Sequence, residues 1–164
     1  MALLPLTYGP DKIFSKIASP VEVVDDVIRS IIDDMLETMY REHAIGMGAN
    51  MVGILKRIVV IDMQEDGLRK PYALINPEIV WFSEDVQTHQ EASICFPGIS
   101  ANITRPRSVR VCYLDYNGQT NELKADGWFA TVIQHEVDYL NGKIFLDYLS
   151  KMKRDMLLKK MIKK

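Results

Sequence analysis

The sequence predicts an α+β fold in which mostly antiparallel sheets pack around one central helix. Three observations support this prediction. Runs of β-branched residues bounded by turn residues fill the middle of the chain, which is typical of short strands joined by hairpins. A helical segment that carries the pair His135-Glu136 follows them. An amphipathic pattern precedes the strands and a lysine-rich segment follows the central helix, so we also expect an N-terminal and a C-terminal helix.

The size and composition of the chain are those of an ordinary globular protein. Its 164 residues are 48% apolar and 26% charged, with a net charge of −2, so we expect a single domain over residues 1–164. Residues 1–6 lack the basic start and apolar length of a signal peptide, and no segment reaches transmembrane length. We therefore expect a cytoplasmic protein with no membrane partner. In that compartment Cys95 and Cys112 are expected to be free thiols.

The first elements are expected to be a helix and a glycine-rich segment. The residues with helical spacing are Val24, Val27, Ile28, Ile31, Met35 and Met39. This helix is expected to begin at Ser19 or at Asp25. Gly46, Gly48 and Gly53 then allow the backbone to approach another element closely. A phosphate-binding loop is the alternative, but no Lys-Ser or Lys-Thr follows Gly53.

Strands are expected across the middle of the chain. The β-branched and aromatic runs are residues 57–62, 72–75, 78–82, 109–114 and 120–125. Residues 86–91 alternate weakly and lead into a segment that we expect Pro97-Gly98 to close as a turn. Asn117-Gly118 is a strong hairpin signal between the last two runs, so the sheet is expected to be mostly antiparallel.

Residues 134–142, Gln-His-Glu-Val-Asp-Tyr-Leu-Asn-Gly, nearly form a metallohydrolase helix. Residues four apart lie on one helix face, so His-Glu-x-x-His directs two imidazoles at one metal ion, with the Glu beside them for proton transfer. Here Tyr139 replaces the second His, and a phenol is a poor ligand at neutral pH. The alternative is a core helix that happens to contain His-Glu. We expect Asp126 to cap this helix and Gly142 to end it.

The C-terminal segment, residues 150–164, is expected to be a basic helix capped by Ser150. After Ser150 it contains seven basic residues and one acidic residue. The apolar positions expected to share one face are Met152, Met156, Leu157 and Ile162. A basic helix on an acidic body can dock on an anionic surface such as RNA, although a solvated helix face is the commoner explanation.

Three segments, residues 46–53, 91–98 and 134–142, resemble in this order and at these separations the peptide deformylase family. The likeness covers the whole chain and implies the α+β fold of that family. The family removes the formyl group from the initiator Met of new proteins, using a divalent metal held by one Cys and two His.

The resemblance, carried over position by position, leaves an incomplete metal site. His135 is the only surviving metal ligand and Glu136 the retained general acid/base, while Ser93 and Tyr139 stand at the positions of the Cys and the second His. Met51 stands where the family has a Gln that polarises the formyl oxygen. A serine hydroxyl gives no thiolate charge and a thioether donates no hydrogen bond. We therefore expect no cofactor, or at most a weakly bound divalent metal such as iron, nickel, cobalt or zinc.

The resemblance also implies residues that shape the substrate pocket. Ile94 matches the residue whose backbone N–H helps to hold the substrate oxyanion, and Gly46 keeps the framework. Glu91 and Arg105 match an acid and a base that brace the site. Without a metal-bound water, a buried Glu136 needs another hydrogen-bond partner, which Tyr139 or Gln134 could supply.

Two functions of different classes follow. The first is a deformylase-like protein without deformylase activity that binds Met-initiated N-terminal peptides, or the ribosome through its basic helix. The alternative is an active metal-dependent hydrolase that removes formyl from the N-terminal Met of nascent proteins with a rebuilt ligand set, in which Cys95 or His89 substitutes. Another version of the hydrolase uses Cys95 and His135 as nucleophile and base. A zinc protease would need both His of the helix, and no DNA partner is expected.

Overall fold

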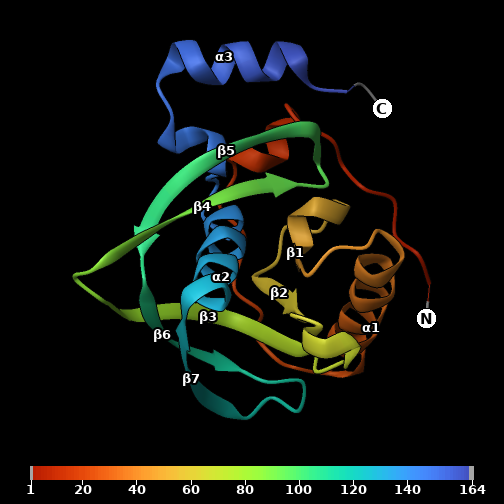
Figure 1. Cartoon of the computed structure of the whole chain (residues 1–164). Helices are drawn as coiled ribbons and strands as arrows, with labels where there is room; N and C mark the ends of the chain where they lie inside the picture. Colours follow the sequence, from red (N-terminus) through yellow and green to blue (C-terminus); the bar gives the residue numbers. More distant parts are fainter. Residues whose placement is uncertain (1, 163–164) are drawn as a thin grey trace.

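Helix α2 (Gly127–Leu140) lies at the centre of the fold, between a five-stranded and a two-stranded sheet (Figure 1). The structure is a computed structural model in which residues 2–162 are described. All strand pairs in the two sheets are antiparallel. The predicted arrangement, antiparallel sheets around a helix that carries the His-Glu pair, is therefore confirmed.

The five-stranded sheet has the order β1-β2-β3-β6-β7. Its strands are β1 (Gly46–Gly48), β2 (Ile58–Ile61), β3 (Tyr72–Phe82), β6 (Ser108–Leu114) and β7 (Thr120–Asp126). The two expected strands around Asn76-Pro77 form one long strand, β3, with a register shift after Ile75. The hairpin expected at Asn117-Gly118 joins β6 to β7, with Gly118 at φ +78°.

The two-stranded sheet comprises β4 (Val86–Ser93) and β5 (Phe96–Pro106), and it differs from the prediction at one point. The expected turn at Pro97-Gly98 is wrong, because both residues lie inside β5. The chain reverses at Ile94-Cys95, where the Cys95 N–H donates to the Ser93 hydroxyl oxygen at 3.2 Å. A side-chain acceptor therefore stabilises a turn that lacks turn residues.

Helix α1 (Asp26–Arg41) begins at the later of the two expected caps. The Asp25 carboxylate accepts from the Ile28 N–H at 3.0 Å, as an N-cap side chain does. Its buried apolar residues are Ile28, Ile32, Met35 and Met39. Val27, expected on this face, is exposed.

Helix α2 ends as expected but does not begin as expected. Asp126 occupies the N-cap position, yet its carboxylate accepts from the Ser108 hydroxyl and makes no cap hydrogen bond, so the predicted cap is wrong. Gly142 follows the helix at φ +73°, and a Cβ there would lie 2.9 Å from the Ser15 backbone. Ten of the fourteen residues of α2 are buried, because sheets cover it on both sides.

Helix α3 (Lys151–Lys160) lies over β5 at the outside of the molecule (Figure 1). The Ser150 side chain caps it by accepting from the Lys153 N–H at 3.2 Å, as predicted. The predicted apolar face is wrong: Met152 is 83% exposed, and Met156 and Ile162 are exposed as well. Of the predicted residues only Leu157 packs against the core, where the neighbouring Leu158 joins it; both are half-buried. Lys163 and Lys164 of the expected basic segment lie outside the described residues.

In the described part of the chain four short 3-10 helices complete the fold: η1 (Lys12–Ser15), η2 (Ala49–Val52), η3 (Glu65–Gly67) and η4 (Phe145–Tyr148). Within residues 2–162, none of the helices combines the length and the hydropathy that crossing a membrane requires.

Candidate active site

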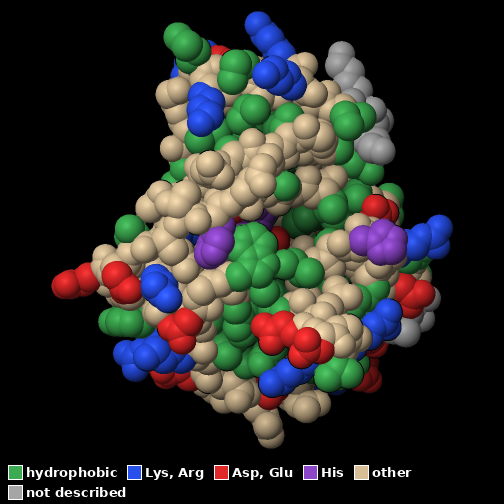
Figure 2. Space-filling model, viewed as in Figure 1, with side chains coloured by type: hydrophobic (Ala, Val, Ile, Leu, Met, Phe, Trp, Pro, Cys, Tyr) green, Lys and Arg blue, Asp and Glu red, His purple; other side chains and the backbone are tan. Residues whose placement is uncertain are grey.

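A cleft of about 630 Å³ opens on the face drawn in Figure 2, where hydrophobic side chains gather around a hollow. Helix α2, strand β1 and the β4–β5 turn form its walls. The predicted site residues that line it are Gly46, Met51, Glu91, Ser93, Ile94, His135 and Glu136. Two others, Arg105 and Tyr139, are buried behind this lining. The structure thus brings together segments that lie up to 90 residues apart in the sequence, as the three motifs suggest.

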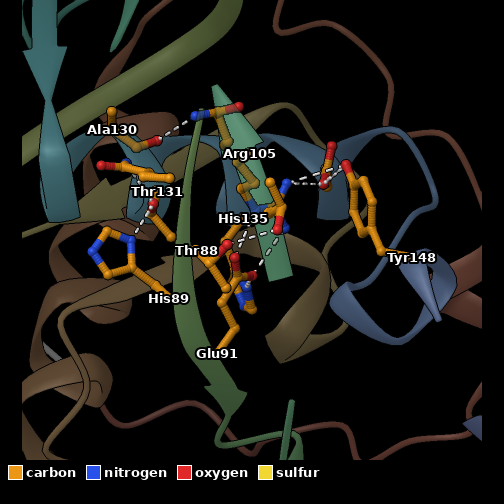
Figure 3. A network of polar contacts seen from close by, with 12 residues as sticks. Thr88, His89, Glu91, Arg105, Ala130, Thr131, His135 and Tyr148 are labelled. Atoms are coloured by element: carbon orange, nitrogen blue, oxygen red, sulfur yellow. Dashed lines mark hydrogen bonds and ion pairs between the residues drawn. The ribbon is translucent and has the colours of Figure 1, made fainter. Parts of the chain in front are cut away.

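A chain of buried polar contacts fixes the ring of His135 (Figure 3). Its Nδ1 donates to Glu91 Oε1 at 2.8 Å. The Arg105 guanidinium donates two hydrogen bonds to the same carboxylate, of 2.7 and 2.9 Å, so the expected Glu91–Arg105 pair is confirmed. The Arg105 guanidinium also donates to Asp138 at 2.8 Å and to the Tyr148 hydroxyl at 3.1 Å. This contact chain orients the imidazole as partners of a ligating His do in metal sites.

The pKa values follow from these contacts. Burial raises the pKa of Glu91, but the hydrogen bonds from His135 and Arg105 outweigh it, so the pKa lies below its ordinary value. Burial lowers the pKa of His135, while the bond to Glu91 and the nearby carboxylates raise it above its ordinary value. The pair is therefore a buried carboxylate beside an imidazole that holds a proton readily.

Tyr139 and Ser93, which the resemblance places at two ligand positions, are hydrogen-bonded to each other. The Tyr139 hydroxyl donates to Ser93 Oγ at 2.6 Å, and the Tyr139 ring packs 5.4 Å from the His135 ring. The Tyr139 side chain is fully buried, and burial raises its pKa well above its ordinary value. Both side chains are therefore neutral hydroxyl groups at physiological pH.

This donor set does not fit a divalent metal ion. The three side chains at the family's ligand positions are His135, Ser93 and Tyr139, which offer one imidazole and two neutral hydroxyls. Zinc and iron sites of this kind use thiolate, imidazole or carboxylate donors. Between residues 2 and 162, no group of three His, Cys, Asp or Glu side chains is placed to hold a metal ion.

The two side chains considered as substitutes do not rebuild a ligand set. Cys95 is buried in the core, and burial raises its pKa far above the ordinary thiol value, which is the opposite of what a ligand or a nucleophile needs. The expected Cys95–His135 nucleophile and base therefore lacks an activated thiol. Among the described residues, His89 is not one that lines the cleft, and its Nδ1 is hydrogen-bonded to the Thr131 hydroxyl at 2.9 Å.

Glu136 faces the cleft without a hydrogen-bond partner for its Oε1 atom among the described residues. It is 5% exposed, and burial raises its pKa to about 7. Neither partner considered from the sequence reaches it, because Tyr139 donates to Ser93 and the Gln134 amide donates to the Pro106 and Ala130 carbonyls. Gly46 packs directly on Glu136, since a Cβ there would lie 2.8 Å from its Oε2 atom.

Met51 is buried at the cleft wall, where its sulfur accepts the Gly48 N–H at 3.3 Å. It therefore donates nothing to a bound carbonyl, as the sequence suggests. Ile94 lies in the β4–β5 turn at the cleft surface.

Sequence reasoning missed several side chains of the site. Asp138 and Tyr148 extend the contact chain behind His135, and Trp128 lines the cleft beside His89, with the two ring centroids 5.1 Å apart. Glu42 lines the cleft from the end of α1. Asp138 lies within the motif of residues 134–142, which is the sequence signal for it, whereas the other contacts arise from tertiary structure.

An α+β fold whose central helix places a His-Glu pair at the floor of a cleft is typical of a class of hydrolases. Comparison with known proteins gives the family: residues 3–155 match the family model described as polypeptide deformylase. The chain belongs to the peptide deformylase family. A Rickettsia conorii protein named "Peptide deformylase-like" is 57% identical over 96% of this chain and 86% of its own length. An Azotobacter vinelandii protein named "Peptide deformylase" is 47% identical over 99% of this chain and 96% of its own length.

Solved structures agree with this assignment. The crystal structure of peptide deformylase from Ehrlichia chaffeensis superimposes with a TM-score of 0.92 and 41% identity, covering 97% of this chain and 94% of that one. The predicted family and fold are thereby confirmed.

Proposed function

We propose that this chain is a deformylase-family protein that binds Met-initiated N-terminal peptides and does not carry out metal-dependent deformylation. The hydrogen bond between Tyr139 and Ser93 carries the proposal, because it joins the two lost ligand positions as neutral hydroxyls. With one imidazole left, a divalent ion has too few anionic or nitrogen donors to stay bound. No resident cofactor is therefore expected.

The rest of the cleft supports peptide binding. Its wall has apolar side chains from three parts of the chain, Ile45, Ile94 and Val132, together with the exposed ring of Trp128. A cavity of about 630 Å³ suits a small ligand or the first residues of a peptide. An unbranched apolar side chain such as that of Met fits such a wall well.

The second candidate is an active deformylase, and the names of the relatives favour it. Proteins that are 47% and 48% identical to this chain, from Azotobacter vinelandii and Pseudomonas aeruginosa, are named "Peptide deformylase". His135 and Glu136 also stand at a ligand and an acid/base position of that family. This candidate requires a ligand set different from the one that the structure describes.

Turnover of a formyl-Met tripeptide separates the two candidates. The assay is anaerobic, with iron(II), cobalt(II), nickel(II) or zinc(II) in excess, beside the Azotobacter vinelandii relative. The proposal predicts no turnover with any of the four metals. Turnover within about a hundredfold of that relative, abolished by Glu136→Ala, would establish the active enzyme instead.

Peptide binding is measured separately, by calorimetry with Met-initiated tripeptides in formylated and unformylated form. Binding of at least one form is expected. If neither form binds, the peptide-binding part of the proposal is wrong.

We further propose that α3 docks on an anionic surface of the ribosome. Basic side chains gather over this helix (Figure 2), and Met152 and Met156 are exposed between them. Removing residues 151–164 should abolish co-sedimentation with ribosomes. Unchanged co-sedimentation would contradict this role.

A further inference from the structure

We infer that the cleft selects peptides whose N-terminal amine is free, and that the Glu136 carboxyl group receives the ammonium group. This inference rests on the proposed peptide-binding function and names the chemical form of the ligand. The proposed function alone does not distinguish formylated from unformylated peptides.

The first observation is the unpartnered Oε1 atom of Glu136. This atom is buried, its residue lines the cleft, and no described donor reaches it. A buried acceptor without a hydrogen bond destabilises a protein by about 1–3 kcal/mol, so a ligand that brings a donor is favoured at this point. The Gly46 backbone, which also lines the cleft, packs closely against the same carboxyl group, since a Cβ there would lie 2.8 Å from Oε2.

The second observation is the charge of the cleft lining. Three Glu side chains line the cleft, Glu42, Glu91 and Glu136, whereas none of its lining residues is Lys or Arg. Arg105 and His135 occupy both carboxylate oxygens of Glu91, which leaves Glu136 as the buried carboxyl group available to a ligand. Of the lining residues only His43 and His135 can carry a positive charge, and His135 is paired with the Glu91 carboxylate, so the carboxyl groups favour a cationic ligand.

The third observation concerns the formyl oxygen. Formylation removes the positive charge, leaves one N–H in place of three, and adds a carbonyl oxygen that needs a donor. Met51 stands where a side-chain donor for this oxygen would lie, and its sulfur accepts from the Gly48 backbone instead. The cleft therefore offers an acceptor for an amine and has lost a donor for a formyl group.

The test compares two probes by calorimetry: Met-Ala-Ala amide and its formylated form. We expect the free amine to bind at least about tenfold more tightly, because a charge-assisted hydrogen bond in a buried site is worth more than a neutral one. Glu136→Gln should remove most of this preference, because it removes the charge that the ammonium group meets. Circular dichroism of the variant checks that it is folded.

Glu122→Gln is the matched control, since Glu122 is exposed on β7 and forms an ion pair with Arg110 away from the cleft. It should leave both affinities unchanged. Equal affinities for the two peptides, tighter binding of the formylated one, or an unchanged preference in Glu136→Gln would overturn this inference and leave the proposed function standing. Absence of binding by both peptides would overturn the proposed function, and this inference with it.

Discussion

At the residue scale, the two side chains that the resemblance places at ligand positions are hydrogen-bonded to each other. Tyr139 is fully buried and Ser93 is the acceptor of its hydroxyl group. The same Ser93 oxygen accepts the Cys95 N–H that holds the β4–β5 turn. The side chains that replace the expected ligands are therefore integrated in the packing of the site.

A double-mutant cycle measures this pair. Ser93→Ala leaves the buried Tyr139 hydroxyl without an acceptor and should lower the free energy of unfolding by about 1–3 kcal/mol. Tyr139→Phe removes the donor and should lower it by about 1 kcal/mol. The double variant should be destabilised by less than the sum, because neither hydroxyl is left unpaired. Urea unfolding provides the three values, and strict additivity would contradict the hydrogen bond.

The raised pKa of Glu136 predicts that the free energy of unfolding depends on pH. Its pKa is about 7 in the folded protein against an ordinary value of 4.5, so the folded state binds more protons than the unfolded state between these values. Stability from this group is therefore present at low pH and is lost as the pH rises through about 7.

Glu136→Gln should remove this loss of stability at high pH, because Gln does not ionise. At pH 8 the variant should be more stable than the natural protein by about 3 kcal/mol, and at pH 4 the two should be nearly equal. Thermal unfolding at both pH values tests this. The charge of Glu136 also raises the pKa of the neighbouring His135, so the difference between the two proteins includes a change in the titration of His135. A variant that is less stable at pH 8 would show that Glu136 has a stabilising partner.

At the scale of elements, the contact chain behind His135 joins four of them. Glu91 belongs to β4, Arg105 to β5, Asp138 to α2, and Tyr148 to η4. Arg105 is 3% exposed and satisfies two carboxylates, so the two-stranded sheet is fastened to the central helix by one guanidinium.

Arg105→Ala should lower the free energy of unfolding by about 3–5 kcal/mol, because it leaves the buried Glu91 carboxylate without its cation. Arg110→Ala is the control. Arg110 forms an exposed ion pair with Glu122 at 3.6 Å, and its removal should change stability by less than about 1 kcal/mol. Chemical denaturation compares the variants. Equal effects would contradict a bracing role for Arg105.

The elements differ in how far the sequence predicts them. The β6–β7 hairpin and the start of α1 are set by local signals, Asn117-Gly118 and Asp25, which act in the same way in any context. The β4–β5 turn has no such signal, because the Ser93 side chain stabilises it. Asp126 is likewise drawn away from its expected cap by Ser108, a residue 18 positions earlier in the chain.

Some residues of the site can also be predicted from the sequence and others cannot. His135, Glu136 and Ser93 can be predicted, because they lie in motifs whose spacing is typical of one family. Trp128 and Tyr148 could not be predicted, since only the packing of α2 and η4 brings them to the cleft and to the contact chain.

At the scale of the whole molecule, the fold is that of the family, whereas the chemistry that we propose for the site is different. The fold superimposes on that of a solved peptide deformylase with a TM-score of 0.92, and the parts that orient the first His are present. On our proposal, Ser93 and Tyr139 stand at ligand positions in place of strong donors. One scaffold can carry different functions when the side chains of its site change.

The metal content of the protein tests the central proposal most directly. The natural chain is incubated anaerobically with iron(II), cobalt(II), nickel(II) or zinc(II), freed of unbound metal and analysed for bound metal. The variant Ser93→Cys/Tyr139→His, which restores thiolate and imidazole donors, is treated in parallel. The proposal predicts almost no bound metal for the natural chain and about one ion per chain for the variant, because ligand type decides affinity. About one ion per natural chain, lost in His135→Ala, would contradict the proposal and indicate a rebuilt metal site.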